Sequence, residues 1–502
     1  MSMWTERRTI VTYALSLLAL VEIIDFAIVA VVIPDLMGAL GANINNVSLT
    51  MTSYIVAAAI CIPLTGLITT KYGIKNIALL SILLFGISSI LCGTATSLPQ
   101  MIIYRIFQGV GGAFLPALAQ AYVVEKYSEQ EQPTMMGIIT ICIVLGPIIG
   151  PIMGGYIVQH MSWSWIFYVN IPICILSFIL IFIFMDKDVK KEINIDYVSF
   201  AFMAIGLGCL EYFIDEGNTN NWFESFEMIS FLLTAIISIS FFIWRGLLGS
   251  SVVNFRIFSN FNFVFSCFVI FLFFALLSSG LTYFSAMLQN VYGMPVDTAG
   301  YLQAPRGVAA VIGAPIYMLL SKKIDARVLM IFAIILTGFA SFATGFMSTT
   351  PNYTLIILLM IMQGFGMIGV FVPLMSITYI GVPDAESADC SGVFNFARNF
   401  SSSIGAAIAA TLISRNQQVF WNDLGTKISY YATGFRYWSQ NLIGTPFAEV
   451  PIQGSALFVR QASILQSYLD MFYLTGIGLI VLCWMPLLLK RPDPNATPHM
   501  GH

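Results

Sequence analysis

Long apolar runs follow one another along most of the chain, and short polar or glycine-containing stretches separate them. A run of about 20 apolar residues is long enough to cross the hydrocarbon core of a bilayer as a helix. An even number of spans places both ends of the chain on the same side of a membrane. Fourteen such runs are present, at about 10–34, 47–70, 75–95, 99–123, 133–158, 163–184, 196–216, 224–246, 261–290, 297–320, 327–346, 352–376, 388–413 and 466–489.

The two ends of the chain resemble each other at an offset near 255 residues. The segment 108–111 recurs as 363–366, Gly137 matches Gly392, and Gly150 matches Gly405. Parallel repeats of six helices are a known transporter plan, with the substrate site between the halves. The predicted units are an N-terminal six-helix bundle at 1–185, a cytoplasmic linker and two inserted transmembrane helices at 186–255, and a C-terminal six-helix bundle at 256–502 that contains a long outer loop at about 415–465.

Composition agrees with this pattern, since 58% of the residues are hydrophobic and only 9% are charged. A soluble chain has about 45–50% apolar and about 25% charged residues. The composition therefore excludes a soluble enzyme, a disordered protein and a nucleic-acid binder. The eight cysteines lie in or beside apolar runs and two of the three histidines lie at the C-terminal tip, so we expect no metal site, catalytic triad or cofactor.

Lysine and arginine are distributed asymmetrically between the loops. Fifteen of the 22 lie on the side that holds both chain ends, four lie in the long outer loop, and three lie inside spans. Because positive residues mark cytoplasmic loops, both termini are predicted to be cytoplasmic. The aromatic residues of the outer loop suit either an interfacial hairpin on the bilayer or a docking surface for a periplasmic partner.

Ionisable residues at membrane depth are costly and therefore mark candidate functional sites. Glu22 and Asp25 are three residues apart on the first helix, and Arg105 and Gln108 are three apart on the fourth. Residues at this spacing share one helix face. If the two helices are neighbours, Arg105 keeps the carboxylates ionised until a proton or a cationic substrate competes for them. The alternative is a static ion pair that only fixes packing.

Other polar residues inside spans have open roles. Glu211, on the inserted pair, is expected to be structural or interfacial, and Arg306 either binds an anionic substrate group or anchors a broken helix. Arg398 lies near the cytoplasmic end of its helix and is expected to extend toward water. The side chains expected to line a substrate cavity are Gln108, Arg306, Gln363, Tyr283 and Asn395.

The fifth span combines glycine and proline in a run at 146–155. Small residues every fourth position allow close helix approach, and proline removes backbone hydrogen bonds and kinks a helix. The run predicts a hinge or seal between the bundles, or else plain close packing. Its members are Gly146, Pro147, Gly150, Pro151, Gly154 and Gly155.

These motifs resemble those of the major facilitator superfamily, and in particular its fourteen-helix drug:proton antiporters of the EmrB/QacA type. The run at 146–155 looks like the antiporter signature, and 104–112 is similar to the helix-4 motif, whose arginine is assigned to proton coupling. The segment from Glu22 to Pro34 looks like the helix-1 motif, and 394–405 is similar to helix 13 of EmrB-type members. The resemblance implies an all-α integral membrane fold, with coupling through Asp25, Glu22 and Arg105. It also implies a periplasmic membrane-fusion adaptor and an outer-membrane channel as partners.

The sequence therefore predicts a multi-pass protein of the bacterial cytoplasmic (inner) membrane that exports amphipathic small molecules in exchange for protons. The alternative with the same fold and coupling is a dedicated exporter of one metabolite, such as a siderophore. A membrane enzyme or sensor is disfavoured because no catalytic constellation or large cytoplasmic domain is evident. A passive channel is disfavoured because it needs no buried titratable pair.

Overall fold

The protein is described from a computed structural model. The structure describes residues 2–42, 47, 49–128, 131–186, 196–249, 251–321, 323–379, 382, 386–427 and 452–490. Every regular element in these ranges is helical. Residues 187–195 of the linker predicted at 186–196, and residues 428–451 of the predicted outer loop, lie outside the described residues.

The first six predicted spans form one helical bundle, in which several spans are built from two shorter helices. Proline marks two of these junctions, at Pro63 and Pro116, because proline disturbs regular helical geometry. The bundle comprises α1 (Ser2–Leu40), α3 (Leu49–Cys61), η1 (Ile62–Leu64), α4 (Thr65–Tyr72), α5 (Ile74–Gly93), α6 (Leu98–Gly112), α7 (Leu115–Lys126), α8 (Gln132–His160), α9 (Trp165–Tyr168) and α10 (Asn170–Phe184).

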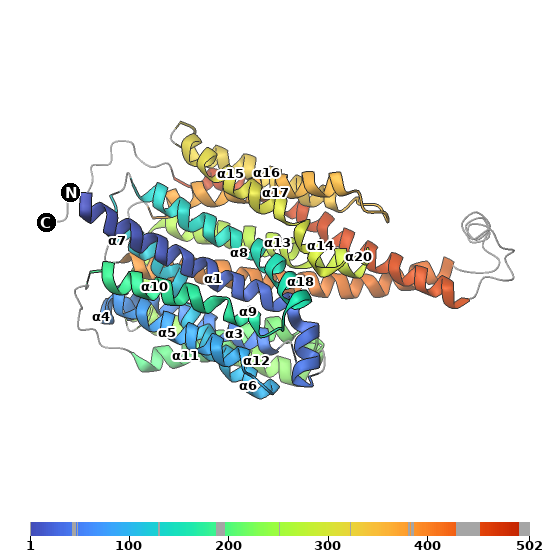
Figure 1. Cartoon of the computed structure of the whole chain (residues 1–502), viewed down its shortest axis with the longest axis horizontal. Coiled ribbons are helices and arrows are strands. Elements are labelled where there is room, and N and C mark those ends of the chain that lie inside the picture. The colour runs from blue at the N-terminus through green and yellow to red at the C-terminus, as the bar shows by residue number, and fades with distance from the viewer. Residues whose placement is uncertain are drawn as a thin grey trace.

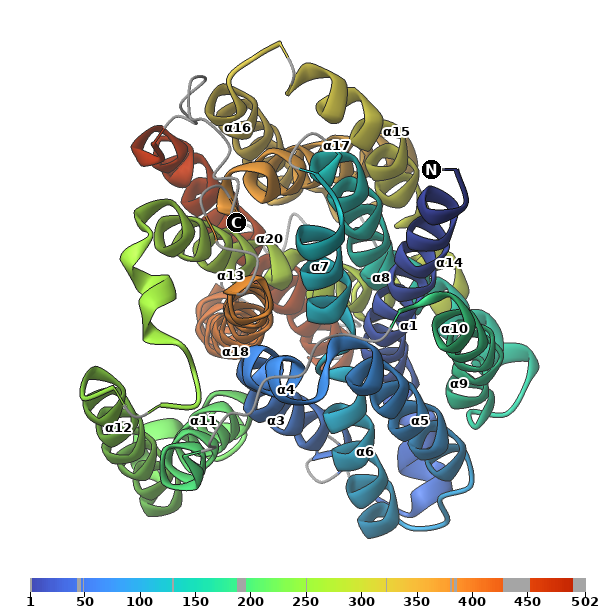
Figure 2. The same ribbon diagram turned by 90° about the vertical axis from the view of Figure 1, so that its left-hand side faces the viewer.

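The inserted pair consists of α11 (Tyr197–Glu216) and α12 (Phe226–Leu247), with η2 (Trp222–Glu224) between them. Asp196 caps α11 by accepting hydrogen bonds from two backbone amides, and it also forms an ion pair with Arg245 on α12 at 2.6 Å. Figure 2 shows α12 on the outside of the molecule and α11 between α12 and the N-terminal bundle. α11 contacts both α3 and α18, so the inserted pair touches both bundles.

The second bundle repeats the plan of the first. Its fourth helix begins after Asn352, whose side chain accepts the hydrogen bond of a first-turn amide. The bundle comprises η3 (Phe255–Ser259), α13 (Phe261–Asn290), α14 (Val296–Tyr301), α15 (Ala304–Leu320), α16 (Ala326–Thr344), α17 (Tyr353–Thr378), α18 (Ser387–Lys427), α20 (Ile452–Leu482) and η6 (Met485–Leu488).

The predicted all-α fold of two six-helix bundles plus two inserted helices is confirmed. Twelve helical segments in the described residues are long and apolar enough to cross a membrane. The two remaining predicted spans correspond to α14 with α15 and to α18. α15 has only 17 residues and α18 carries many polar side chains, yet both pack among the other helices. The limits proposed for the three units stay a prediction.

The internal repeat is visible as equivalent packing in the two bundles. Gly109 of α6 lies against α3 and Gly111 lies against α5, so that an added Cβ would come within about 2.5 Å of neighbouring backbone. Gly364 of α17 lies against α15 and Gly366 lies against α16 in the same manner. In both bundles, therefore, two glycines let the fourth helix approach the second and third.

Basic side chains gather at one end of the molecule, which we call the basic end. Arg8 forms an ion pair with Glu131 at 2.6 Å, Lys75 donates to the carbonyl of Phe182 at 2.9 Å, and Arg327 pairs with Asp325 at 2.8 Å. α1 begins at this end of the bundle (Figure 1). The arrangement is the one that the loop charges predicted, and the cytoplasmic assignment of this end stays a prediction.

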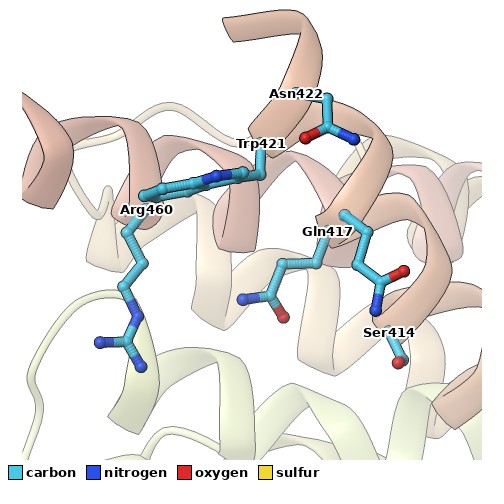
Figure 3. Close-up of a pocket in the computed structure, with 6 residues that line it drawn as sticks. Ser414, Gln417, Trp421, Asn422 and Arg460 are labelled. Atoms are coloured by element: carbon cyan, nitrogen blue, oxygen red, sulfur yellow. The ribbon is translucent and has the colours of Figure 1, made fainter. Parts of the chain in front are cut away.

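At the opposite end, α18 and α20 extend beyond the other helices (Figure 1). The predicted outer loop at 415–465 is therefore helical at both ends, because α18 continues to Lys427 and α20 begins at Ile452. An open cavity of about 520 Å³ lies between the two extensions. Figure 3 shows the Trp421 indole of α18 lying toward the Arg460 side chain of α20.

Candidate functional site

The centre of the N-terminal bundle holds a buried ion pair between α1 and α6. Nη1 of Arg105 donates to Oδ2 of Asp25 at 2.7 Å, and neither side chain is exposed to solvent. Gln108, one turn after Arg105, donates through Nε2 to Oδ1 of Asp25 at 2.9 Å and accepts from Arg105 at 2.7 Å. The structure therefore brings together three of the residues predicted for this site.

Two uncharged residues that were not singled out in the sequence complete the network. Nδ2 of Asn170, the first residue of α10, donates to Asp25 at 2.6 Å, and Nε2 of Gln108 donates to Ser89 of α5 at 2.9 Å. Nε of Arg105 donates to the backbone carbonyl of Thr50 at 3.1 Å. Asn170 is a lone amide inside a strongly apolar run, and that contrast was the signal available in the sequence.

Glu22 lies near this network but is not hydrogen-bonded to Arg105. Oε1 of Glu22 accepts from the Tyr54 hydroxyl at 3.0 Å, and its buried Oε2 has no hydrogen-bond partner in the described structure. The Arg105 guanidinium stacks on the Tyr54 ring at 4.3 Å. Tyr54 of α3 therefore connects the two acidic positions of α1, a role that the sequence did not reveal.

Arg398 does not extend toward water, so that expectation is wrong. Only 3% of this α18 residue is exposed, since the helix packs along α4, α7 and α13. Its guanidinium interacts electrostatically with Glu22 of the opposite bundle, and one of its nitrogens, Nη1, has no hydrogen-bond partner in the described chain. A basic side chain from one bundle thus faces an acidic side chain from the other.

The glycine-rich run of α8 packs directly on α1, beside the acidic residues. An added Cβ on Gly146 would collide with the Ile23 side chain, and one on Gly150 would lie 2.6 Å from the Cβ of Ala27. Pro147 lies inside the helix, which nevertheless continues to His160. The predicted close helix approach is present, and a hinge function for this run stays a prediction.

The remaining residues predicted to line a cavity do not form one surface with Asp25. Asn395 donates to Gln120 of α7 at 2.6 Å, and Tyr379 donates to the same amide oxygen at 3.1 Å. These buried bonds join the two bundles. Tyr283 donates to the carbonyl of Ala406 at 3.3 Å, within the C-terminal bundle.

Arg306 and Gln363 lie together in the C-terminal bundle rather than beside Asp25. Arg306 has no exposed surface and its Nη2 approaches Sδ of Met360 at 3.1 Å. The backbone of Arg306 packs on Gly364, the residue that follows Gln363. The structure thus places Gln108 in the site of the N-terminal bundle, and Arg306 with Gln363 in a second polar group of the C-terminal bundle. Asn395 and Tyr283 belong to neither group.

Glu211 of α11 is fully buried where the inserted pair meets both bundles. Neither of its carboxyl oxygens has a hydrogen bond of standard geometry in the described residues, and Ser403 of α18 lies next to it. Asp215, one turn later, accepts a hydrogen bond from Thr52 of α3. No group of three or more His, Cys, Asp or Glu side chains in the described ranges is arranged to hold a metal ion.

Comparison with known proteins identifies the family. Residues 15–406 match the model of the Major Facilitator Superfamily. The chain is 29% identical over 496 residues to the multidrug export protein EmrB of Escherichia coli K12, covering 96% of this chain and 95% of that one. It is 30% identical over 488 residues to EmrB of Haemophilus influenzae, covering 95% of each.

A likeness to solved structures supports the same fold. The proton:xylose symporter XylE superimposes with a TM-score of 0.60 at 14% identity, over 97% of this chain and 96% of the symporter. The many apolar helices show a multi-pass membrane protein. The chain belongs to the Major Facilitator Superfamily, a family of membrane transporters and not of enzymes, and within it to the EmrB-type group.

Proposed function

We propose that the chain is a proton-driven antiporter that exports amphipathic small molecules across the cytoplasmic membrane. The ion pair between Asp25 and Arg105 carries this proposal. A buried ion pair often stabilises a protein no more than apolar residues of similar volume, so stability alone does not explain it. The multidrug export that the names of the relatives in E. coli and H. influenzae state supports the same activity.

In this mechanism Glu22 receives the proton. The ion pair of Asp25 with Arg105 links the change in charge to the movement of the N-terminal bundle. The free oxygen of Glu22 is available for protonation, and the ionised form is attracted to Arg398 across the interface between the bundles. A proton on Glu22 removes that attraction and loosens the contact. Rocking of the bundles then exposes the cargo to the other side, as in alternating access.

The orientation follows from the charges. With the basic end in the cytoplasm, the extended parts of α18 and α20 lie in the periplasm. A periplasmic adaptor that leads to an outer-membrane channel would dock on these extensions. The cavity near Trp421 and Arg460 offers that partner an aromatic and a cationic group.

The experiment is transport in proteoliposomes with an imposed pH gradient, using amphipathic dyes of either charge. Asp25→Asn should abolish gradient-driven transport while the purified protein stays folded and monodisperse. Asp35→Asn, an exposed aspartate on the same helix, is the matched control and should transport normally. Gradient-driven transport by Asp25→Asn at the wild-type rate would refute the assigned role.

A further inference from the structure

The break between α14 and α15 places two polar side chains deep in the C-terminal bundle. Gln303 precedes the first turn of α15 and Arg306 lies within it, and neither residue has any exposed surface. α15 is 17 residues long, so its N-terminal end carries the partial positive charge of a helix dipole. Pro305 has no amide hydrogen there and the amide of Arg306 donates to the carbonyl of Gln303, but the Gln303 side chain does not cap this end.

Arg306 is a buried cation that forms no ion pair with an acidic side chain among the residues that the structure describes. Its bonds are a 3.3 Å contact with Oε1 of Gln303 and the 3.1 Å contact with the Met360 sulfur, and the Phe284 ring centre lies 5.9 Å away. No charged group in the described part of the chain interacts with it. Two donors remain unused there, Nε of Arg306 and Nε2 of Gln303.

This arrangement is unfavourable without an anion. A buried charge with no partner is costly, and a cation at a helix N-terminus faces a dipole of the same sign. Arg105 of the other bundle has a carboxylate partner in Asp25 and donates through Nε to the carbonyl of Thr50, so that only its Nη2 lacks a hydrogen-bond partner in the described structure. Arg306 has neither a carboxylate nor a backbone partner for Nε there. The unused donors and the helix terminus all favour a negative group from outside the chain.

The internal repeat shows what is missing from this place. In the N-terminal bundle the polar cluster is built around the carboxylate of Asp25, and the equivalent position in the C-terminal bundle is Gly280. A Cβ added to Gly280 would lie 3.7 Å from Nε2 of Gln363 and 3.5 Å from Phe472, which are ordinary contact distances. At this place the C-terminal bundle thus keeps an amide and a cation, and a glycine stands where the other bundle has its carboxylate.

We propose that Arg306, Gln303 and the N-terminus of α15 bind the carboxylate group of an amphipathic anion. The site corresponds to the place that Asp25 occupies in the N-terminal bundle. The ligand supplies the negative charge that is absent there because the equivalent residue is Gly280. Aromatic side chains such as Phe284 and Phe472 contact its apolar part. The inference rests on the proposed function in that it takes this anion to be cargo.

The test measures binding without a proton gradient, so that a failure of proton coupling cannot imitate a failure of this site. Purified protein in lipid nanodiscs is melted in a buffer free of chloride and of carboxylates, to which 4-phenylbutyrate, its neutral amide or chloride is added. Because a ligand that binds the folded state raises the melting temperature, the shift reports the affinity. We expect 4-phenylbutyrate alone to raise the wild-type melting temperature. Loss of the charge in Arg306→Gln should weaken this binding about tenfold or more.

A second pair of variants applies even if Arg306→Gln fails to fold. Gly280→Asp supplies an internal carboxylate, so it should raise the melting temperature without ligand and abolish the effect of 4-phenylbutyrate. Gly280→Asn has the same size without the charge and should keep the ligand effect. Equal protection by acid and amide, protection by chloride alone, no protection of the wild type, or equal behaviour of the two Gly280 variants would each overturn the proposal.

Discussion

The ion pair between Asp25 and Arg105 allows stability and function to be separated by a double-mutant cycle. Arg105→Met removes the guanidinium and leaves Asp25 with the amide donors of Gln108 and Asn170. Asp25→Asn keeps the size of the side chain but leaves Arg105 buried without its counter-charge. The double variant Asp25→Asn/Arg105→Met removes both charges together.

The expected magnitudes follow from complete burial of both partners. Removing one member of a buried pair costs about 3–5 kcal/mol, because the other charge is left without compensation. Asp25→Asn should show this full loss, and Arg105→Met should show less because two amides still bind the carboxylate. Replacing both members is often close to neutral. The double variant should therefore be more stable than Asp25→Asn alone.

The assay is equilibrium unfolding of each purified variant in mixed micelles, followed by dye transport in proteoliposomes. We expect a favourable coupling energy of about 2–4 kcal/mol between the two sites, in keeping with residues that share one network. All three variants should lack proton-driven transport, including the double variant whose stability recovers. Additive losses of stability, or transport by the double variant, would refute the reasoning.

Three further predictions concern other contacts. Gly405→Ala forces a methyl group onto a backbone carbonyl of α13 and should cost about 1–3 kcal/mol or more of unfolding free energy, whereas Gly425→Ala on the same helix, with open space around it, should cost far less. The hydrogen bond from Arg245 lowers the pKa of Asp196, so the contribution of Asp196 to stability is complete above the ordinary aspartate pKa and disappears as the pH falls through the lowered value. The melting temperature of the wild type should therefore fall over this acidic range, and the part of the fall that is due to Asp196 should be absent in Asp196→Asn. An unchanged profile of melting temperature against pH would contradict this. Asn395→Leu breaks the bond to α7 and should raise amide hydrogen exchange in that helix, and unaltered exchange would show that the bond does not hold the bundles together.

The charged part of the site could be predicted because charge is rare in this chain. Asp25 and Arg105 stand out against apolar neighbours, and their spacing to Glu22 and Gln108 gave the helix faces. Asn170 and Tyr54 carry a weaker signal, since uncharged polar residues are common in membrane helices and even the lone amide of Asn170 does not show what it binds. Their contacts depend on the rotation of α10 and α3, which the sequence pattern does not determine.

Helix ends outside the membrane were harder to predict than spans. Hydropathy marks where a helix leaves the bilayer, but a polar segment can continue the same helix in water. This is why α18 continues through 415–427, where the hydropathy pattern predicts a loop. The position of Arg398 was misjudged for a related reason, because the distance of a residue from a predicted span end does not show which neighbours cover it.

The single helix α18 also has a mechanical consequence. Its 41 residues give a rod about 60 Å long at about 1.5 Å per residue, roughly twice the thickness of the hydrocarbon core. Rigid rotations in switching proteins reach about 15°. A rotation of that size about the inner end would carry the far tip roughly 15 Å sideways. The displacement of that tip, followed with a distance probe, would then report the state of the charges buried along the inner part of the helix.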